Sequence, residues 1–182
     1  MRVISGKLKG RKIDGYNITG TRPTMDRVKE SIFSMIQEYI PKAVVLDLFS
    51  GSGNYGIECI SNGANFVYFN DYNIKCVKVI KDNLTNMNVF NQSVVTNMVY
   101  QKALEYYKDK NIKFDLVFLD PPYKKHIINE IIEFLLDNNL LNNHGLIICE
   151  FTEKEEYISN NLKLLKDKRY GDKYVFIYKY DN

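Results

Sequence analysis

The chain has 182 residues, of which 45% are hydrophobic and 26% charged, an ordinary composition for one globular domain. No run approaches the ~18 uncharged apolar residues of a membrane span, and the basic start MRVISGKLKGRK lacks the apolar core of a secretory signal. We therefore expect a cytoplasmic protein with no membrane partner. The three cysteines have no metal-ligand spacing, so reduced thiols are expected and no metal site.

Basic residues are concentrated at the start of the chain. The net charge is only +3, yet residues 1–29 hold eight Lys or Arg against two Asp. A basic end on a near-neutral body is typical of a protein that binds a polyanion, although a solvated basic surface is the plain alternative.

The first predicted elements differ from those that follow. Residues 2–5 and 10–13 alternate around Gly6 and Gly10, which predicts a small basic hairpin. Pro23 and Thr24 then precede an apolar pattern of helical period that predicts a helix as far as Ile40.

From residue 44 onward, predicted strands alternate with predicted helices. The strands are 44–48, 66–70, 93–96, 115–119 and 146–151, and the helices after them are 54–62, 73–86, 99–108, 126–138 and 153–160. This alternation is typical of a parallel sheet covered on both faces. Two last strands, 162–169 and 173–180, are joined too closely to be parallel. The sequence predicts an α/β fold with a doubly wound, mostly parallel, seven-stranded sheet and an antiparallel last strand.

Ligands of such sheets bind beyond the carboxyl ends of the strands. The first central strand leads into DLFSGSGNYGIE, where Gly51, Gly53 and Gly56 fit the pattern G-x-G-x-x-G. This pattern permits close approach of a ligand to the backbone, but a tight strand-to-helix turn would also explain it. Asp47, inside the strand, would repel a pyrophosphate and could instead receive the cationic methionine end of S-adenosylmethionine. A cap or turn acceptor is its plain interpretation.

An acid follows the next strand. Asp71 lies 20 residues after Gly51, the spacing of a carboxylate that hydrogen-bonds both hydroxyls of a bound ribose. NAD and S-adenosylmethionine both carry an adenosine ribose, so Asp71 does not separate these two cofactors.

The third unusual strand end is FDLVFLDPPYKK, residues 114–125. The carboxylate of Asp120 and the carbonyl of Pro121 can both accept hydrogen bonds from one exocyclic amino group, and Tyr123 offers a face for stacking a base. Such a pocket would aim an amino nitrogen at the methyl group of a sulfonium, where transfer is mainly a matter of orientation. A proline-rich turn that closes a strand is the alternative.

Five blocks of the chain resemble, in order, those of the RsmD family of 16S ribosomal RNA guanine-N2 methyltransferases. The blocks are RVISGKLKGRKI, TRPTMDRVKESIFSMI, LDLFSGSGNYGIE, FDLVFLDPPY and RYGDKYVFIYK. The block with DPPY is shared with other amino-methyltransferases, including adenine-N6 enzymes. The first two blocks are therefore the ones that restrict the resemblance to the RsmD family. The resemblance implies a Rossmann-like, class I S-adenosylmethionine-dependent methyltransferase of one domain, residues 1–182, with residues 1–24 as an RNA-contacting extension. It also implies 16S rRNA as the substrate, and for so small a protein an assembly particle of the small subunit is expected, with free RNA as the alternative. A monomer is the default expectation.

The resemblance also implies roles for individual residues. The cofactor would be bound by Arg22, Thr24, Asp47, Phe49, Ser50, Gly51, Ser52, Gly53, Asp71, Asn97 and Met98. The target guanine would be held by Asp120, Pro121 and Tyr123, and RNA by Arg2, Lys7, Lys9, Arg11, Lys12, Arg27, Lys124 and Lys125. The chain departs from the family at Asn97-Met98, where the family usually has an acid that meets the adenine amino group, and at Asp71, where Glu is commoner.

Other functions fit parts of the sequence. An adenine-N6 DNA methyltransferase would normally need a target-recognition domain, for which the ~30 residues after residue 150 leave no room. A nucleic-acid-binding module that senses S-adenosylmethionine without catalysis remains an alternative. An NAD dehydrogenase is disfavoured, because no His or Lys is placed for hydride chemistry and DPPY would have no role.

Overall fold

A computed structural model gives the fold of residues 1–15, 23–121, 127–152 and 157–181, with the side chains of residues 23–26 also left undescribed. The helices are α1 (Pro23–Ile36), α2 (Asn54–Ser61), α3 (Ile74–Asn86), α4 (Tyr100–Asp109) and α5 (Ile127–Asp137). The strands are β1 (Val44–Asp47), β2 (Phe66–Asn70), β3 (Ser93–Thr96), β4 (Phe114–Leu119), β5 (Leu141–Phe151), β6 (Leu162–Tyr170) and β7 (Lys173–Tyr180).

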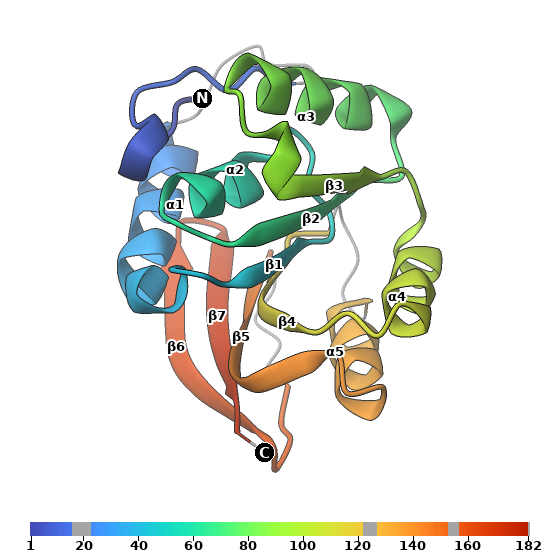
Figure 1. Ribbon diagram of the computed structural model, residues 1–182. Helices are drawn as coiled ribbons and strands as arrows, with labels where there is room; N and C mark the ends of the chain where they lie inside the picture. Colours follow the sequence, from blue (N-terminus) through green and yellow to red (C-terminus); the bar gives the residue numbers. More distant parts are fainter. Residues whose placement is uncertain (16–22, 122–126, 153–156, 182) are drawn as a thin grey trace.

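All seven strands form one sheet in the order β3-β2-β1-β4-β5-β7-β6 (Figure 1). The five strands from β3 to β5 are parallel to one another, and β7 is antiparallel to both β5 and β6. This confirms the predicted doubly wound sheet and its antiparallel last strand.

The two faces of the sheet bury separate hydrophobic clusters. On one face α1, α2 and α3 pack on side chains such as Val45, Val67 and Phe118. On the other face α4 and α5 pack on Leu46 and Val117, so successive residues of a strand serve opposite faces. Figure 1 shows the same division, with α4 and α5 across the sheet from α1 and α2. Because helices cover both faces, a ligand is expected to bind beyond the carboxyl ends of the strands.

The predicted hairpin at the start of the chain is present in a minimal form. One antiparallel bridge joins Arg2 to Lys12, and a 3-10 turn at Gly6–Leu8 lies between them. The amide of Val3 donates to the carbonyl of Arg11 at 3.0 Å, which holds the two arms together.

Three predicted boundaries are wrong. The first helix ends at Ile36 rather than at Ile40, and a 3-10 turn at Gln37–Tyr39 follows it. β5 begins at Leu141 rather than at residue 146, because Leu141 pairs with Phe114 before a register shift, while the polar residues 142–144 hide the strand pattern. Of the predicted helix 153–160, residues 157–160 are not helical, since Ser159 bridges Leu162 at the start of β6. Residues 153–156 lie outside the described part of the chain.

None of the described helices is long and apolar enough to cross a membrane.

Candidate functional site

The carboxyl ends of β3, β2, β1 and β4 bring the described candidate residues to one edge of the sheet. Asn97 and Met98 follow β3, Asp71 follows β2, Asp47 and residues 49–53 end or follow β1, and Asp120 and Pro121 follow β4. Asp47 pairs in register with Phe69 of β2 and with Phe118 of β4. Asp71 and Asp120 therefore each lie only two positions beyond a direct neighbour of Asp47, which brings the three carboxylates to one short stretch of the edge.

The glycine turn after β1 is held by the acid after β2. The backbone amide of Gly51 donates to Oδ2 of Asp71 at 2.9 Å, and the amide of Asn73 donates to Oδ1 at 2.9 Å. Gly53 has a φ of 79°, a left-handed conformation that favours glycine directly before α2. The spacing of 20 residues between Gly51 and Asp71 thus corresponds to a direct contact.

The third glycine of the pattern has a packing role. A Cβ atom on Gly56 would lie 2.2 Å from Cε1 of Phe69 and 2.8 Å from Cγ1 of Val67. Only a residue without a side chain lets α2 approach β2 this closely. The same approach brings the amide of Gly56 within 3.1 Å of Oδ2 of Asp47.

Asp47 is a buried acid at the centre of this edge. Asp47 is 2% exposed and forms no ion pair within the described residues. Burial raises the pKa of Asp47 from 3.8 to about 7, with smaller upward contributions from Asp71 and Asp120 against the hydrogen bond from Gly56. A carboxylate in this state is stabilised by a cationic group brought beside it.

A small cavity of about 130 Å³ lies where β1, β2 and β3 end. It is lined by Phe49, Asn70, Tyr72, Met98, Val99, Tyr100 and Gln101. Its walls are mostly apolar or aromatic, which suits a flat ring. The side-chain amide of Asn70 donates to the carbonyls of Leu48 and Met98 and so fixes the loops that contain these two residues.

Asn97 does not line this cavity. Its amide nitrogen donates to the carbonyls of Asp71 at 2.8 Å and Tyr72 at 2.9 Å, which holds the loop after β2. Of the two residues predicted for a ring pocket here, Met98 is a wall of the cavity and Asn97 supports the neighbouring loop.

Asp120 lies in a charged group that the sequence did not indicate as a unit. Nζ of Lys173 lies 3.7 Å from Oδ1 of Asp120 and 2.8 Å from Oε2 of Glu150, and the hydroxyl of Tyr55 donates to Oε1 of Glu150. Loss of solvation at this half-buried position raises the pKa of Asp120 to about 7, Glu150 adds to this rise, and Lys173 opposes it. Glu150 carries the same signal as Asp120, an acid near the end of a buried strand. Lys173 stands in the block RYGDKYVFIYK, which indicated the family but not a contact with these two acids.

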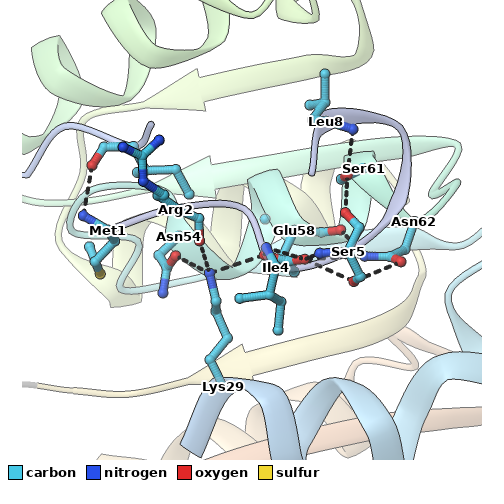
Figure 2. Close-up of polar contacts among 12 residues, drawn as sticks. Met1, Arg2, Ile4, Ser5, Leu8, Lys29, Asn54, Glu58, Ser61 and Asn62 are labelled. Carbon is cyan, nitrogen blue, oxygen red and sulfur yellow. Dashed lines mark hydrogen bonds and ion pairs between the residues drawn. The ribbon is translucent and has the colours of Figure 1, made fainter. Parts of the chain in front are cut away.

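The basic start of the chain is fastened to the core by a buried ion pair. Nζ of Lys29 lies 3.0 Å from Oε2 of Glu58, and Nζ also donates to the carbonyl of Arg2 (Figure 2). Glu58 in turn accepts hydrogen bonds from the amides of Ile4 and Ser5. The start of the chain is therefore anchored through its backbone groups, which bind Lys29 and Glu58.

Several predicted RNA-binding side chains have partners within the protein. Arg2 donates to the carbonyl of Gly10, Lys7 to the side chain of Gln92, and Arg11 to the carbonyl of Asn86, while Lys12 lies 2.6 Å from Asp14. All four side chains remain at exposed positions, as do Lys9 and Arg27.

Asn83 joins the end of the basic segment to the glycine turn. Its buried amide donates to the carbonyls of Asp14 at 2.9 Å and Ser52 at 3.1 Å, and its oxygen accepts from the amide of Asp14. Residues 1–14 thus end beside the candidate site, an arrangement that the sequence did not reveal.

Some predicted site residues fall outside the described part of the chain. These are Arg22, Tyr123, Lys124 and Lys125, together with the side chain of Thr24.

Comparison with known proteins gives consistent matches over the whole chain. The family described as Conserved hypothetical protein 95 matches residues 1–179. The ribosomal RNA small subunit methyltransferase D of Haemophilus influenzae is 35% identical over 175 residues, which cover 94% of this chain and 89% of that protein. The solved structure of the Escherichia coli protein yhhF aligns with a TM-score of 0.87 at 30% identity, over 100% of this chain and 98% of that one. An RNA methyltransferase from Salinibacter ruber, in complex with S-adenosyl-L-homocysteine, has the same fold, with a TM-score of 0.64, 13% identity and coverage of 90% and 95%.

Proposed function

The chain belongs to the Conserved hypothetical protein 95 family, the family of the RsmD methyltransferases, and from this membership we propose that it methylates the exocyclic N2 amino group of a guanine in 16S rRNA. S-adenosylmethionine would be the methyl donor. The Rossmann-like fold is that of class I S-adenosylmethionine-dependent methyltransferases. The observation that carries the proposal is the arrangement of Asp47, Asp71 and Asp120 on adjacent strand ends, because it puts the groups proposed to bind the donor and the acceptor side by side.

The residues at the edge suit the parts of the donor. The buried carboxylate of Asp47 has no cationic partner in the described chain and would receive the charged methionine end. Asp71 would hold the ribose, next to the turn of Ser50, Gly51, Ser52 and Gly53. The apolar cavity beside Phe49 and Met98 would take the adenine ring.

The acceptor side needs groups that orient an amine. When bound, S-adenosylmethionine supplies a methyl group already activated by its sulfonium. Asp120 and the carbonyl of Pro121 would accept hydrogen bonds from the guanine amino group and so direct its lone pair at that methyl. The same two acceptors would stabilise the positive charge that develops on nitrogen. Tyr123 would stack on the base.

The RNA would bind along the basic start of the chain. The backbone anchoring by Lys29 and Glu58 supports this role, because it leaves exposed basic side chains on a fixed segment that ends, at Asp14, beside Ser52. Residues 1–24 would form the RNA-contacting part of a single domain, with Arg22 and Thr24 over the cofactor and Lys124 and Lys125 near the target nucleotide. A monomer acting in the cytoplasm on a small-subunit assembly particle fits this arrangement.

The proposal is tested by methyl transfer from labelled S-adenosylmethionine to small-subunit RNA and to under-methylated small-subunit particles. Nucleoside digestion should then place the label in N2-methylguanosine, and Asp120→Ala should abolish it. Label in adenine, or in DNA, would favour an adenine-N6 enzyme. Cofactor and RNA binding without any transfer would favour the non-catalytic sensing module.

A further inference from the structure

Lys173 bridges two carboxylates at the proposed acceptor site. Its Nζ lies 2.8 Å from Glu150 and 3.7 Å from Asp120. The Glu150 side chain is 4% exposed, whereas that of Asp120 is 40% exposed. The lysine therefore connects an enclosed acid to an acid that solvent can reach.

Three parts of the fold fix this bridge. Leu119 pairs with Cys149, so Asp120, directly after β4, and Glu150 of β5 lie side by side. β7 runs antiparallel beside β5, which places its first residue, Lys173, at the same edge. Tyr55 of α2 holds Glu150 from the other side, while its ring stacks on Phe118 at a centroid distance of 5.1 Å.

The charges around Asp120 are unbalanced without the lysine. From the elements packed here, the acids Asp47 and Glu150 and the hydroxyl of Tyr55 interact electrostatically with Asp120, and Asp172 adds to the negative field at Lys173. Burial by itself would lower the pKa of Lys173, but the attraction of Asp120 and Glu150 outweighs it and raises that pKa above 10.5. Lys173 therefore carries a positive charge at every pH at which RNA is stable.

We propose that Lys173 is a positioning residue that favours the ionised form of Asp120 and fixes this carboxylate as the acceptor for the nucleobase amino group, with Glu150 and Tyr55 holding the lysine in place. The role of Asp120 as acceptor rests on the proposed function. The effect of Lys173 on Asp120 can be tested without that function, since the protonation of Asp120 can be measured on the ligand-free protein.

The lysine and the glutamate should act on Asp120 in opposite directions. Without the cation, in Lys173→Met, repulsion from Glu150 and Asp47 is unopposed, and the titration midpoint of Asp120 should rise by about one unit or more. Without the neighbouring anion, in Glu150→Gln, the midpoint should fall by roughly half a unit to one unit. Lys173→Arg keeps the charge and should restore a midpoint near that of the wild type.

The measurement is a carbon-detected NMR titration of the Asp120 carboxyl in the ligand-free variants, followed by the pH dependence of methyl transfer. The acidic limb of the rate profile should move with the NMR midpoint, and turnover at pH 7 should fall about tenfold in Lys173→Met and recover in Lys173→Arg. Lys179→Met is the matched control, because Lys179 lies on the same strand, pairs with Asp181 at 3.5 Å, and is at the opposite end of β7. It should change neither quantity.

Equal midpoints in the wild type and Lys173→Met, or shifts in the same direction for Lys173→Met and Glu150→Gln, would overturn the inference. If Lys173→Met does not fold, Glu150→Gln decides alone: a downward shift supports the inference and an unchanged midpoint refutes it. If the midpoints shift as expected but no substrate is methylated, the proposed function fails while the effect of Lys173 on Asp120 stands.

Discussion

Lys29 and Glu58 form an ion pair that is closed off from solvent, with the two side chains 1% and 0% exposed and 3.0 Å between Nζ and Oε2. The pair joins the basic start of the chain to both helices: Lys29 of α1 donates to the carbonyl of Arg2 and to Asn54 of α2, and Glu58 of α2 accepts from the amides of Ile4 and Ser5 (Figure 2). The pair is thus the anchor of the proposed RNA-contacting segment.

Breaking this pair should destabilise the protein strongly. Lys29→Met leaves a buried carboxylate without its cation, which typically costs about 3–5 kcal/mol of the free energy of unfolding. Denaturant unfolding measures the loss. The double variant with Glu58→Met should lose less than the sum of the two single changes, because it leaves no unpaired charge behind. Lys108→Met, which removes an exposed ion pair with Glu105, is the control and should change the free energy of unfolding little, because solvent screens exposed pairs. Equal effects at Lys29 and Lys108 would contradict the anchoring role.

Asp47 should make the ligand-free protein less stable as pH rises. Because its pKa is raised from 3.8 to about 7, the folded chain keeps a proton that the unfolded chain has lost between these values, and the free energy of unfolding falls across that interval. Asp47→Asn removes this contribution. Relative to the wild type, the variant should gain nothing near pH 4 and ~2–4 kcal/mol at pH 8.

The same variant should bind S-adenosylhomocysteine more weakly, because the cationic methionine end loses its carboxylate. Thermal unfolding between pH 4 and pH 8, with and without the ligand, measures both effects. A variant that is no more stable at pH 8 and binds as tightly as the wild type would show that Asp47 is a turn acceptor only.

Gly56 should not tolerate a methyl group. In Gly56→Ala the new Cβ would lie 2.2 Å from the ring of Phe69, so α2 or the ring must move, at a typical cost of about 1–3 kcal/mol. Adding Phe69→Leu gives the methyl group room, and the double variant should be more stable than the sum of the single changes predicts. Strict additivity in denaturant unfolding would exclude a direct clash between these two residues.

Asp71 should matter for binding through both of its oxygens. They accept from the amides of Gly51 and Asn73, so Asp71→Ala loosens the glycine turn as well as removing the proposed ribose contact. Calorimetry should show affinity for S-adenosylhomocysteine reduced at least about tenfold, or ~1.4 kcal/mol. Asp82→Ala, an exposed acid on α3, should bind as the wild type does. Unchanged affinity in Asp71→Ala would exclude a role in the ligand site.

The fold was predictable because its signals are local. Each apolar strand and the helix after it can be read from periodicity, and the short connection before Lys173 requires an antiparallel last strand. Asp47, Asp71 and Asp120 were recognisable because strand ends of a parallel sheet share an edge.

The remaining contacts depend on distant parts of the chain meeting. Asn83 joins Asp14 to Ser52 from the last turn of α3, and Lys173 reaches Asp120 across more than 50 residues of sequence. Asn83 stands in no motif, and the block RYGDKYVFIYK around Lys173 indicated the family without marking a contact with Asp120. The start of β5 at Leu141 was missed because residues 142–144 are polar and at least partly exposed, so they lack the apolar pattern of a buried strand.

A crystal structure with S-adenosylhomocysteine tests the central claim most directly. We predict that the methionine part lies along residues 50–53 with its amine facing Asp47, that the ribose hydroxyls meet Asp71, and that the sulfur faces the cleft at Asp120. A ligand bound at another edge of the sheet, or a cleft at Asp120 filled by side chains of the protein itself, would contradict the account.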